Sequence, residues 1–496
     1  MPSDFPSDTD LDPEDWPAFR AQAHAMLDDI LDHVAGVRAR PVWQAPPGEL
    51  PASLAGGLPE APAPLADIHA DFLADVAPFA VGNLHPRFMG WVHGAGTVVG
   101  AVAEMLAAGL NANLGGRWQA PIQLERQVAG WMAELTGLPP TSSGLFVTGA
   151  SMANFVAVLV ARTAALGPSS RTQGVAASGA RLVAYASAAA HNCVPRAMDM
   201  AGLGSGALRS IATDADGRMD VAAAAASIAA DRAAGLTPFL LVGTAGGVDI
   251  GAIDDLFALA DLAAREQLHF HVDGAFGALG MMSSELKPLF AGIERADSIA
   301  MDFHKWGQAP YDAGFVLVRD PQKHMAAFAS PAAYLGRTER GLAAGSPWPC
   351  DFGPDLSRGF RALKVWFTMR AYGSRRLGEI MLQTCRLARR LAERIDSEPE
   401  LERLAPVPLN IVCFRYRAGE DSDRLNEELV VQLQESGLAA PSTTRIGGRL
   451  AIRAAIVGHR TRAEDVDALV EAVLDLGRRL AGRAPIVTEG SADTGS

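Results

Sequence analysis

The chain has 496 residues, a formal net charge of −13 and a hydrophobic content of 49%. That length suffices for two or three domains with sizeable cores, and the acidic balance argues against nucleic acid or an anionic membrane surface as a partner. The longest apolar stretches, such as 155–160, are shorter than the roughly 18 residues of a membrane span. The sequence therefore predicts a globular protein that does not cross a membrane.

The amino-terminal residues predict a cytoplasmic protein with a helical arm. Residues 1–8 are acidic and contain prolines, without the basic and apolar regions of a signal peptide. Asp12 and Pro13 have the character of a helix start, and apolar residues then recur at helical spacing as far as Val34. Residues 41–64 are rich in Pro, Gly and Ala and are expected to form an extended connector.

The cysteines do not indicate a metal site. The four of them, Cys193, Cys350, Cys385 and Cys413, lie far apart, without the spacing of zinc ligands or of a disulfide framework. We expect buried free thiols and no bound metal.

From about His85 onward, short apolar runs alternate with longer helical patterns. The strand-like runs are 144–148, 181–185, 239–243, 269–273, 298–302 and 314–319. This alternation is typical of an α/β domain with a mostly parallel sheet. The helical stretch 360–395 is expected to lead to a smaller unit with strands at 409–415 and 450–453. We therefore predict a helical and extended segment (1–84), a large α/β domain (85–375), a small α/β domain (376–484) and a disordered tail (485–496).

Lys305 and Asp273 each come at or just after the end of a predicted strand. Lys305 is one of only four lysines, which leaves 39 arginines among the 43 basic residues. Lysine, unlike arginine, can lose its proton and act as a nucleophile. Asp273 is costly to bury unless it meets a positive partner, either a protonated ring nitrogen or a nearby arginine. An amine for a Schiff base and a carboxylate for a pyridine nitrogen are the two protein groups that pyridoxal phosphate (PLP) needs.

Three other turns follow predicted strands. The turn Gly149-Ala150-Ser151 precedes an apolar helix and either binds a phosphate or simply caps that helix. His191 either stacks on a flat cofactor or is structural. The glycines around Thr244 fit a tight turn as well as a close approach to a ligand.

In this order and at these separations, the motifs resemble those of the group II PLP-dependent amino-acid decarboxylases, which include aromatic-L-amino-acid and glutamate decarboxylases. The resemblance extends from about Asp12 to Arg483. It implies the fold type I of PLP enzymes: a large domain with a mostly parallel seven-stranded sheet, a smaller C-terminal α/β domain and an N-terminal helical segment. It also implies a homodimer.

The resemblance implies a role for each motif residue. Lys305 would form the Schiff base, Asp273 would keep the ring nitrogen protonated, and His191 and Ala275 would lie on opposite faces of the ring. The phosphate would be bound by Ala150 and Ser151, with Thr244 and His304 close by. Asp302 stands where some members carry asparagine, and we assign it no role.

Further residues are expected to bind and process the substrate. Arg358 matches a position that can contact the substrate carboxylate, with a surface ion pair as the alternative. Trp91, Val92 and His93 fall where the family lines its side-chain pocket. In the family, a tyrosine placed like Tyr334 protonates the carbanion left after CO₂ departs, whereas phenylalanine there is associated with aldehyde formation.

The sequence thus predicts PLP-dependent decarboxylation of an L-amino acid, with aromatic or bulky substrates first and acidic ones such as glutamate or aspartate second. A PLP-dependent aminotransferase and a non-catalytic binding protein are the alternatives. We expect an interwoven homodimer in which the loop that carries Tyr334 completes the partner's site.

Overall fold

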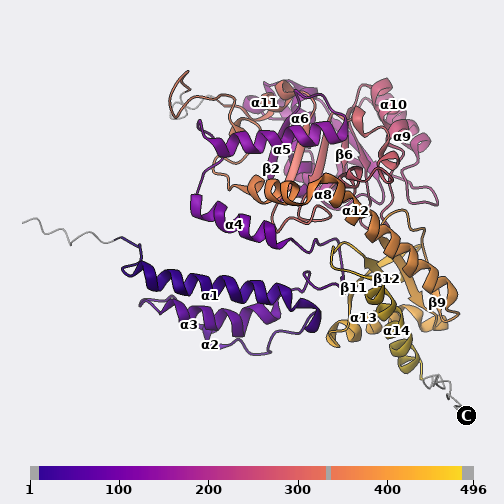
Figure 1. Cartoon of the computed structure of the whole chain (residues 1–496). Coiled ribbons are helices and arrows are strands. Elements are labelled where there is room, and N and C mark those ends of the chain that lie inside the picture. Colours follow the sequence, from indigo (N-terminus) through magenta and orange to yellow (C-terminus); the bar gives the residue numbers. More distant parts are fainter. Residues whose placement is uncertain (1–9, 331–336, 483–496) are drawn as a thin grey trace, which may run out of the picture.

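The computed structural model describes residues 10–330 and 337–482 and contains two sheets. Figure 1 shows a large domain around one sheet, a small domain around the other, and a helical arm beside them. Tyr334 and the tail predicted at 485–496 lie outside the described residues. Among the described helices, none combines the length and the apolar character needed to span a bilayer.

The large domain contains the predicted mostly parallel sheet of seven strands, in the order β2-β8-β7-β6-β5-β3-β4. Only the pairings of β8 are antiparallel. The strands are β2 (Ser143–Val147), β3 (Leu182–Ser187), β4 (Leu208–Ile211), β5 (Thr237–Thr244), β6 (His269–Asp273), β7 (Ser298–Asp302) and β8 (Gly314–Val318). The edge strand β4 was not predicted. Its four residues are too few to show an alternation of apolar and polar side chains, and only Ile211 is buried.

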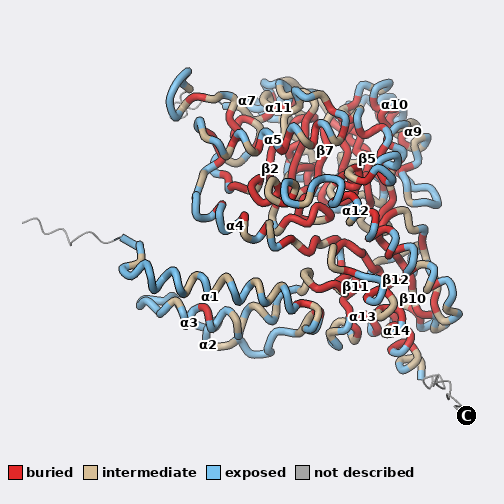
Figure 2. Tube along the Cα trace, in the orientation of Figure 1, coloured by how far each residue is buried: buried red, intermediate tan, exposed pale blue. Residues whose placement is uncertain are grey.

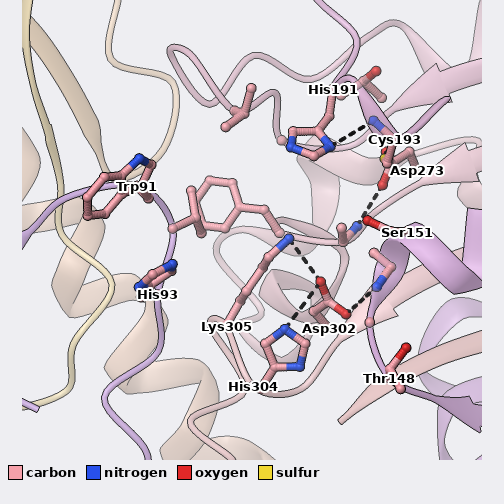
Figure 3. Close-up of a pocket in the computed structure, with 18 of the residues that line it drawn as sticks. Trp91, His93, Thr148, Ser151, His191, Cys193, Asp273, Asp302, His304 and Lys305 are labelled. Carbon is pink, nitrogen blue, oxygen red and sulfur yellow. Dashed lines mark hydrogen bonds and ion pairs between the residues drawn. The ribbon is translucent and has the colours of Figure 1, made fainter. Parts of the chain in front are cut away.

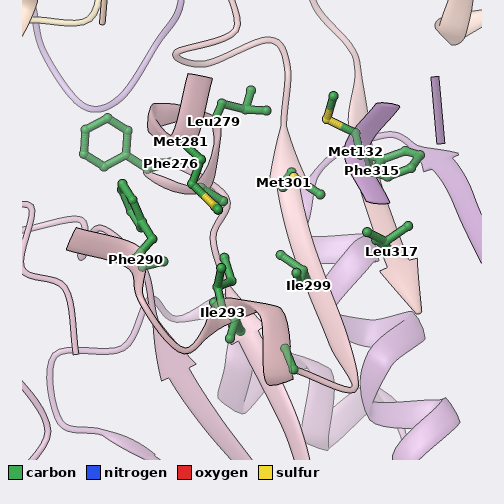
Figure 4. Close-up of a cluster of buried hydrophobic side chains, with 14 of the residues drawn as sticks. Met132, Phe276, Leu279, Met281, Phe290, Ile293, Ile299, Met301, Phe315 and Leu317 are labelled. Atoms are coloured by element: carbon green, nitrogen blue, oxygen red, sulfur yellow. The ribbon is translucent and has the colours of Figure 1, made fainter. Parts of the chain in front are cut away.

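Helices cover both faces of this sheet. Side chains alternate between the faces of a strand, so Ile299 and Met301 of β7 pack in one layer with Met132 of α5 (Figure 4), whereas Ala300 packs in the other with Val156 of α6. The domain's helices are α4 (Val98–Leu110), α5 (Ala120–Thr136), α6 (Ala150–Leu166), α7 (Ser170–Gln173), α8 (Cys193–Met200), α9 (Val221–Ala233), α10 (Leu256–Glu266) and α11 (Pro321–Phe328). This double burial explains why these strands appear as continuous apolar runs in the sequence.

The small domain has a five-stranded sheet in the order β1-β11-β12-β10-β9. Its strands are β1 (Phe88–Met89), β9 (Leu401–Arg403), β10 (Ile411–Tyr416), β11 (Ala440–Ile446) and β12 (Arg449–Ala455), with helices α13 (Ser422–Glu435) and α14 (Ala463–Leu480) packed on it. Strand β1 pairs in parallel with β11. Residues 88–89 therefore belong to this sheet and not to the large domain. A strand of two residues is too short to be predicted from the sequence.

Helix α12 (Arg361–Ser397) connects the two domains. Its first part packs on α4 and α5, and its later part reaches α14, β9 and β10. Gly373, at φ 73° and ψ 150°, interrupts the helix between these parts. A left-handed φ of this kind favours glycine.

The arm consists of α1 (Trp16–Ala35), α2 (Ala52–Ala55) and α3 (Leu65–Asp71). Helix α1 begins later than predicted, because the Asp15 carboxylate accepts the N–H of Ala18 at 2.9 Å and Asp12 does not cap the helix. No residue of α1 is buried, and Figure 2 shows the arm mostly in the exposed and intermediate colours. The four cysteines, in contrast, are buried and free, as predicted.

Candidate active site

A cavity of about 400 Å³ lies where the parallel strands of the large sheet end. Strands β2, β3, β5, β6 and β7 run in one direction, so their carboxyl ends and the turns that follow them meet at one edge of the sheet. The predicted residues that line this cavity are Trp91, Val92, His93, Ala150, Ser151, His191, Thr244, Asp273, Ala275, His304 and Lys305. Side chains that the sequence placed more than 200 residues apart are therefore neighbours.

Lys305 extends into the cavity from the turn after β7 (Figure 3). Its Nζ lies 2.9 Å from Oδ2 of Asp302, whose side chain is almost fully buried. Burial works to lower the pKa of Lys305, but the Asp302 and Asp273 carboxylates outweigh it and raise that pKa. In the protein without cofactor, Lys305 is therefore held as an ammonium ion.

Asp273 ends β6 and is buried, yet no described lysine, arginine or histidine forms an ion pair with it. Its Oδ1 accepts the N–H of Ala275 at 3.2 Å, and its Oδ2 accepts the thiol of Cys193 at 3.7 Å. The alternative predicted for this acid, an arginine partner, is absent from the described residues. A buried carboxylate that faces a cavity in this way is suited to a cationic group on a ligand.

The turn between β2 and α6 brings a helix amino terminus to the cavity. The Ala150 N–H donates to Asp302 Oδ1 at 2.7 Å, and Ser151 also lines the cavity. Gly314 of β8 allows this arrangement, because a Cβ built on it would lie 2.3 Å from the Cα of Gly149. A helix amino terminus with a serine hydroxyl is a common site for a phosphate.

Histidines border the cavity on two sides. The Nδ1 of His191 accepts the backbone N–H of Cys193 at 3.2 Å, which fixes the orientation of the ring. The Nδ1 of His304 accepts the N–H of Ala313 at 3.0 Å, so its proton is on Nε2 when the ring is neutral. Burial lowers the pKa of His304 in spite of the nearby Asp302 charge.

An aromatic wall closes the remaining side. The ring of His93 stacks on those of Phe88 and Trp91, at centroid distances of 5.8 and 5.7 Å, and Tyr311 meets it edge-on. Phe88 and Trp91 are themselves 6.3 Å apart, so the three rings form one cluster. Gly94 brings this segment against the lysine turn, since a Cβ there would lie 2.3 Å from the carbonyl oxygen of Lys305. Burial, followed by the Lys305 charge, lowers the pKa of His93, so the wall is uncharged at neutral pH.

Comparison with known proteins identifies the family. The model of the pyridoxal-dependent decarboxylase conserved domain matches residues 47–417. An aromatic-L-amino-acid decarboxylase of Bacillus atrophaeus is 31% identical over 479 residues, which cover 95% of this chain and 98% of that protein. The chain belongs to the pyridoxal-dependent decarboxylase family.

Other members of the family act on different substrates. An L-2,4-diaminobutyrate decarboxylase of Rhizobium meliloti is 32% identical, with 80% of this chain and 79% of that protein covered. The crystal structure of Oryza sativa TDC with PLP and tryptamine has a TM-score of 0.87 and 28% identity, and it covers 95% of this chain and 100% of its own. The family assignment decides for decarboxylation over the aminotransferase and non-catalytic alternatives, and it confirms PLP as the cofactor.

The geometry fits this cofactor on three independent features. An amine, a buried carboxylate without a cationic partner among the described residues, and a helix amino terminus with a serine border one cavity. They match the aldehyde, the ring nitrogen and the phosphate of PLP. One feature does not favour it: the Asp302 carboxylate accepts the N–H of Ala150 at the end of α6 where the phosphate is expected.

The structure corrects the prediction for Arg358. Its guanidinium does not line the cavity and is almost fully buried against Glu125, at 2.5 Å between Nη2 and Oε1. It also donates to the carbonyl oxygens of Leu114 and Phe146. With the donors of both Nη atoms occupied in this way, Arg358 stabilises the fold and does not reach a substrate carboxylate. Its partner is buried, so the surface ion pair that was the alternative is not observed either.

The sequence prediction missed several residues at the site. Cys193, Phe276, Val248 and Tyr311 line the cavity, and no motif distinguished them. Arg453 of β12 lies behind the wall and donates to the carbonyl oxygens of Trp91 and Val248. A buried arginine in an apolar strand was the available indication, because such a side chain must find partners.

Proposed function

We propose that this decarboxylase acts on L-amino acids with aromatic side chains and releases the corresponding amine and CO₂. The observation that supports this substrate class most directly is the uncharged wall of Trp91, His93 and Tyr311, which lines one cavity with Lys305 and is backed by Phe88. Named relatives that carry the aromatic activity, in Bacillus atrophaeus and Oryza sativa, cover at least nine tenths of the chain.

The charges of the cavity support this order of substrates. Among its described lining residues, Lys305 is the only lysine or arginine, and it is assigned to the cofactor. The second carboxylate of glutamate or aspartate would then be buried without a partner, which is costly. The second amino group of a diamino acid would need a carboxylate. The two among the cavity's described residues are Asp273, which is assigned to the ring nitrogen and accepts the Cys193 thiol, and Asp302, which pairs with Lys305. An aromatic side chain needs neither charge.

The protein groups would act as follows. Lys305 holds the cofactor and yields to the substrate amine, and Asp273 keeps the ring nitrogen protonated. PLP, when bound, accepts the electrons that the Cα–carboxylate bond leaves behind. His191 would orient the ring, and Ala150 and Ser151 would bind the phosphate, with Thr244 and His304 close by. The apolar wall excludes water from the reacting carbon.

A substrate panel tests the substrate class. We expect CO₂ release from tryptophan, tyrosine or phenylalanine at a kcat/KM at least about 100-fold above that for glutamate or 2,4-diaminobutyrate, since a buried unpaired charge costs several kcal/mol. Release from glutamate or 2,4-diaminobutyrate alone would contradict the proposal. Lys305→Ala should abolish both activity and the visible absorbance of lysine-bound PLP, whereas Lys323→Ala, at an exposed lysine, should change neither.

Tyr334, outside the described residues, is proposed to return a proton to Cα once CO₂ has left. Phenylacetaldehyde synthase of Arabidopsis thaliana, 29% identical, shows that relatives with a different product exist. Tyr334→Phe should divert the product from amine to aldehyde, measured by chromatography. A variant that still forms only amine would show that another group supplies the proton.

We further propose a homodimer in which the arm of α1 to α3 covers a second copy of the chain. Large apolar side chains lie exposed there and on the neighbouring α4, including Trp16, Ile68, Phe72 and Met105. So many large apolar side chains exposed on adjacent helices are unusual on a monomer. Light scattering should give twice the chain mass, and Ile68→Asp should lower it, whereas Val431→Asp on α13 should not. A fully active wild-type monomer would refute the proposal.

A further inference from the structure

Asp273 accepts a hydrogen bond from a buried thiol, and this thiol is the last donor in a longer series. Sγ of Cys193 lies 3.7 Å from Asp273 Oδ2, and Nδ2 of Asn154 lies 3.3 Å from the same sulfur. The exposed fractions of the three residues are 6% or less, so their partners must come from the protein or from a bound ligand.

A backbone carbonyl fixes the orientation of the Asn154 amide. Its Nδ2 donates to the carbonyl oxygen of Ala150 at 2.9 Å, an atom that can only accept. The amide oxygen therefore faces His271 Nε2, at 2.7 Å, and accepts a hydrogen bond there. His271 must carry its proton on Nε2.

Two more hydrogen bonds continue in the same direction. Ser298 Oγ lies 2.8 Å from His271 Nδ1 and 2.8 Å from His269 Nε2. Burial lowers the pKa of both imidazoles to about 4, although nearby carboxylates oppose it, so both rings are neutral at pH 7. His271 then has a bare Nδ1, which accepts the Ser298 hydroxyl proton, and the serine oxygen accepts from His269. The pairing of β6 with β7 sets His271 opposite Ser298.

Every donor in the series points toward Asp273. Since the sulfur of Cys193 already receives the N–H of Asn154, its own proton is directed to Oδ2. Burial, and then the Asp273 charge, raise the pKa of Cys193, so the group stays a thiol. The backbone N–H of Ala275 occupies Oδ1. Each carboxylate oxygen thus has a donor that is itself held in place.

We propose that Cys193 is a positioning residue for Asp273: its thiol, oriented by Asn154 and His271, keeps the carboxylate turned toward the ring nitrogen of the cofactor. This inference rests on the proposed function, because it assigns Asp273 to that nitrogen. A thiol is a weak donor, so removing it should reduce the effect of Asp273 without abolishing it.

Two substitutions at Cys193 separate positioning from space filling. Cys193→Ala removes the donor, and Cys193→Ser keeps one. For Cys193→Ala we expect kcat to fall roughly 5- to 10-fold with KM within about twofold, and PLP to dissociate more readily by a similar factor. The pH midpoint of the visible absorbance of bound PLP should rise by about 0.5 unit or more, since a less firmly protonated ring withdraws fewer electrons. Cys193→Ser should stay within about twofold of wild type.

The control is Cys385→Ala, which removes another buried free thiol, on α12 and away from the cavity. It should leave the absorbance midpoint unchanged. Should Cys193→Ala fail to fold, Asn154→Asp provides a second test. The new carboxylate accepts the Cys193 proton and draws it from Asp273, so the same midpoint shift is expected with the thiol present.

Unchanged absorbance midpoints in both Cys193→Ala and Asn154→Asp would overturn the inference, and so would an equal shift in Cys385→Ala. An equal shift in Cys193→Ser would also overturn it, because serine retains the donor. Wild-type protein that binds no PLP or releases no CO₂ would instead refute the proposed function. The PLP titration and the CO₂ assay of the wild type are therefore done first.

Discussion

The buried pair of Arg358 and Glu125 allows a direct test of whether that arginine serves the fold or the substrate. Glu125→Gln keeps the size and one acceptor of the side chain but removes its charge. In the wild type, Glu125 pairs with Arg358 at 2.5 Å and also accepts the N–H of Phe146 at 3.1 Å. The substitution leaves the guanidinium buried without a countercharge and places amide hydrogens against its N–H groups.

The magnitude follows from burial. The side chains of Arg358 and Glu125 are 1% and 4% exposed, and breaking such a pair by removing one partner costs about 3–5 kcal/mol. The matched control is Asp396→Asn, which breaks a hydrogen-bonded pair with Arg403 whose side chains are 49% and 34% exposed. Pairs of that kind contribute about 1 kcal/mol or less. The two variants should therefore differ clearly in stability.

Urea unfolding followed by circular dichroism measures the stability, and steady-state kinetics of the folded proteins measures KM. We expect Glu125→Gln to lose about 3–5 kcal/mol of unfolding free energy with KM within about twofold of wild type. The reasoning is refuted if Glu125→Gln is as stable as Asp396→Asn while KM rises tenfold or more. That result would indicate that Arg358 binds the substrate carboxylate, as the sequence predicted.

Three further substitutions test the cavity and its surroundings. Asp302→Asn removes a charge beside the α6 amino terminus and lowers the pKa of Lys305, so PLP should bind at least about tenfold more tightly in absorbance titrations at pH 7. Gly314→Ala places a Cβ 2.3 Å from Gly149 Cα and should weaken PLP binding at least about tenfold in the same titration. Burial raises the pKa of Asp254 to about 6, above the 3.8 of an ordinary aspartate, so the folded protein favours its protonated form and loses stability as pH rises through this window. Between pH 5 and 7 the wild type should lose about 1 kcal/mol relative to Asp254→Asn in urea unfolding.

Each of these expectations has a contrary outcome. Weaker PLP binding by Asp302→Asn would mean that the carboxylate assists the cofactor. Gly359→Ala, at a glycine with open space around it, should bind PLP as wild type does, and an equal loss there would remove the steric explanation for Gly314. A stability difference between wild type and Asp254→Asn that is constant from pH 5 to 7 would show that Asp254 does not titrate in that range.

The residues that the sequence predicted well are those whose chemistry is local. Asp273 follows a strand buried on both faces, and Lys305 lies in the turn after another, so the apolar runs themselves locate them. Arg358 was predicted wrongly because its partner Glu125 lies 233 residues away in the chain. No residue near Arg358 in the sequence indicates that partner. Cys193 was missed because a thiol acquires its role only through Asn154 and Asp273, which other elements bring to it.

Element boundaries failed for a similar reason. Asp12 and Asp15 both precede a proline by one or two residues, and the choice between two possible caps depends on the tertiary setting of the arm. Strand β1 exists only because β11, some 350 residues later, offers it hydrogen bonds. The period of side chains predicts elements of five or more residues, and shorter ones depend on their partners.

The position of Arg453 makes the carboxy-terminal unit part of the catalytic apparatus. From β12 it holds the backbone of Trp91 and Val248, two residues of the cavity surface, although Lys305 and Asp273 belong to the other domain. A chain truncated before β12 would retain Lys305 and Asp273. It would lose Arg453 and the hydrogen bonds that hold the backbone of the substrate pocket in place. Selectivity among amino acids would then disappear before cofactor attachment does.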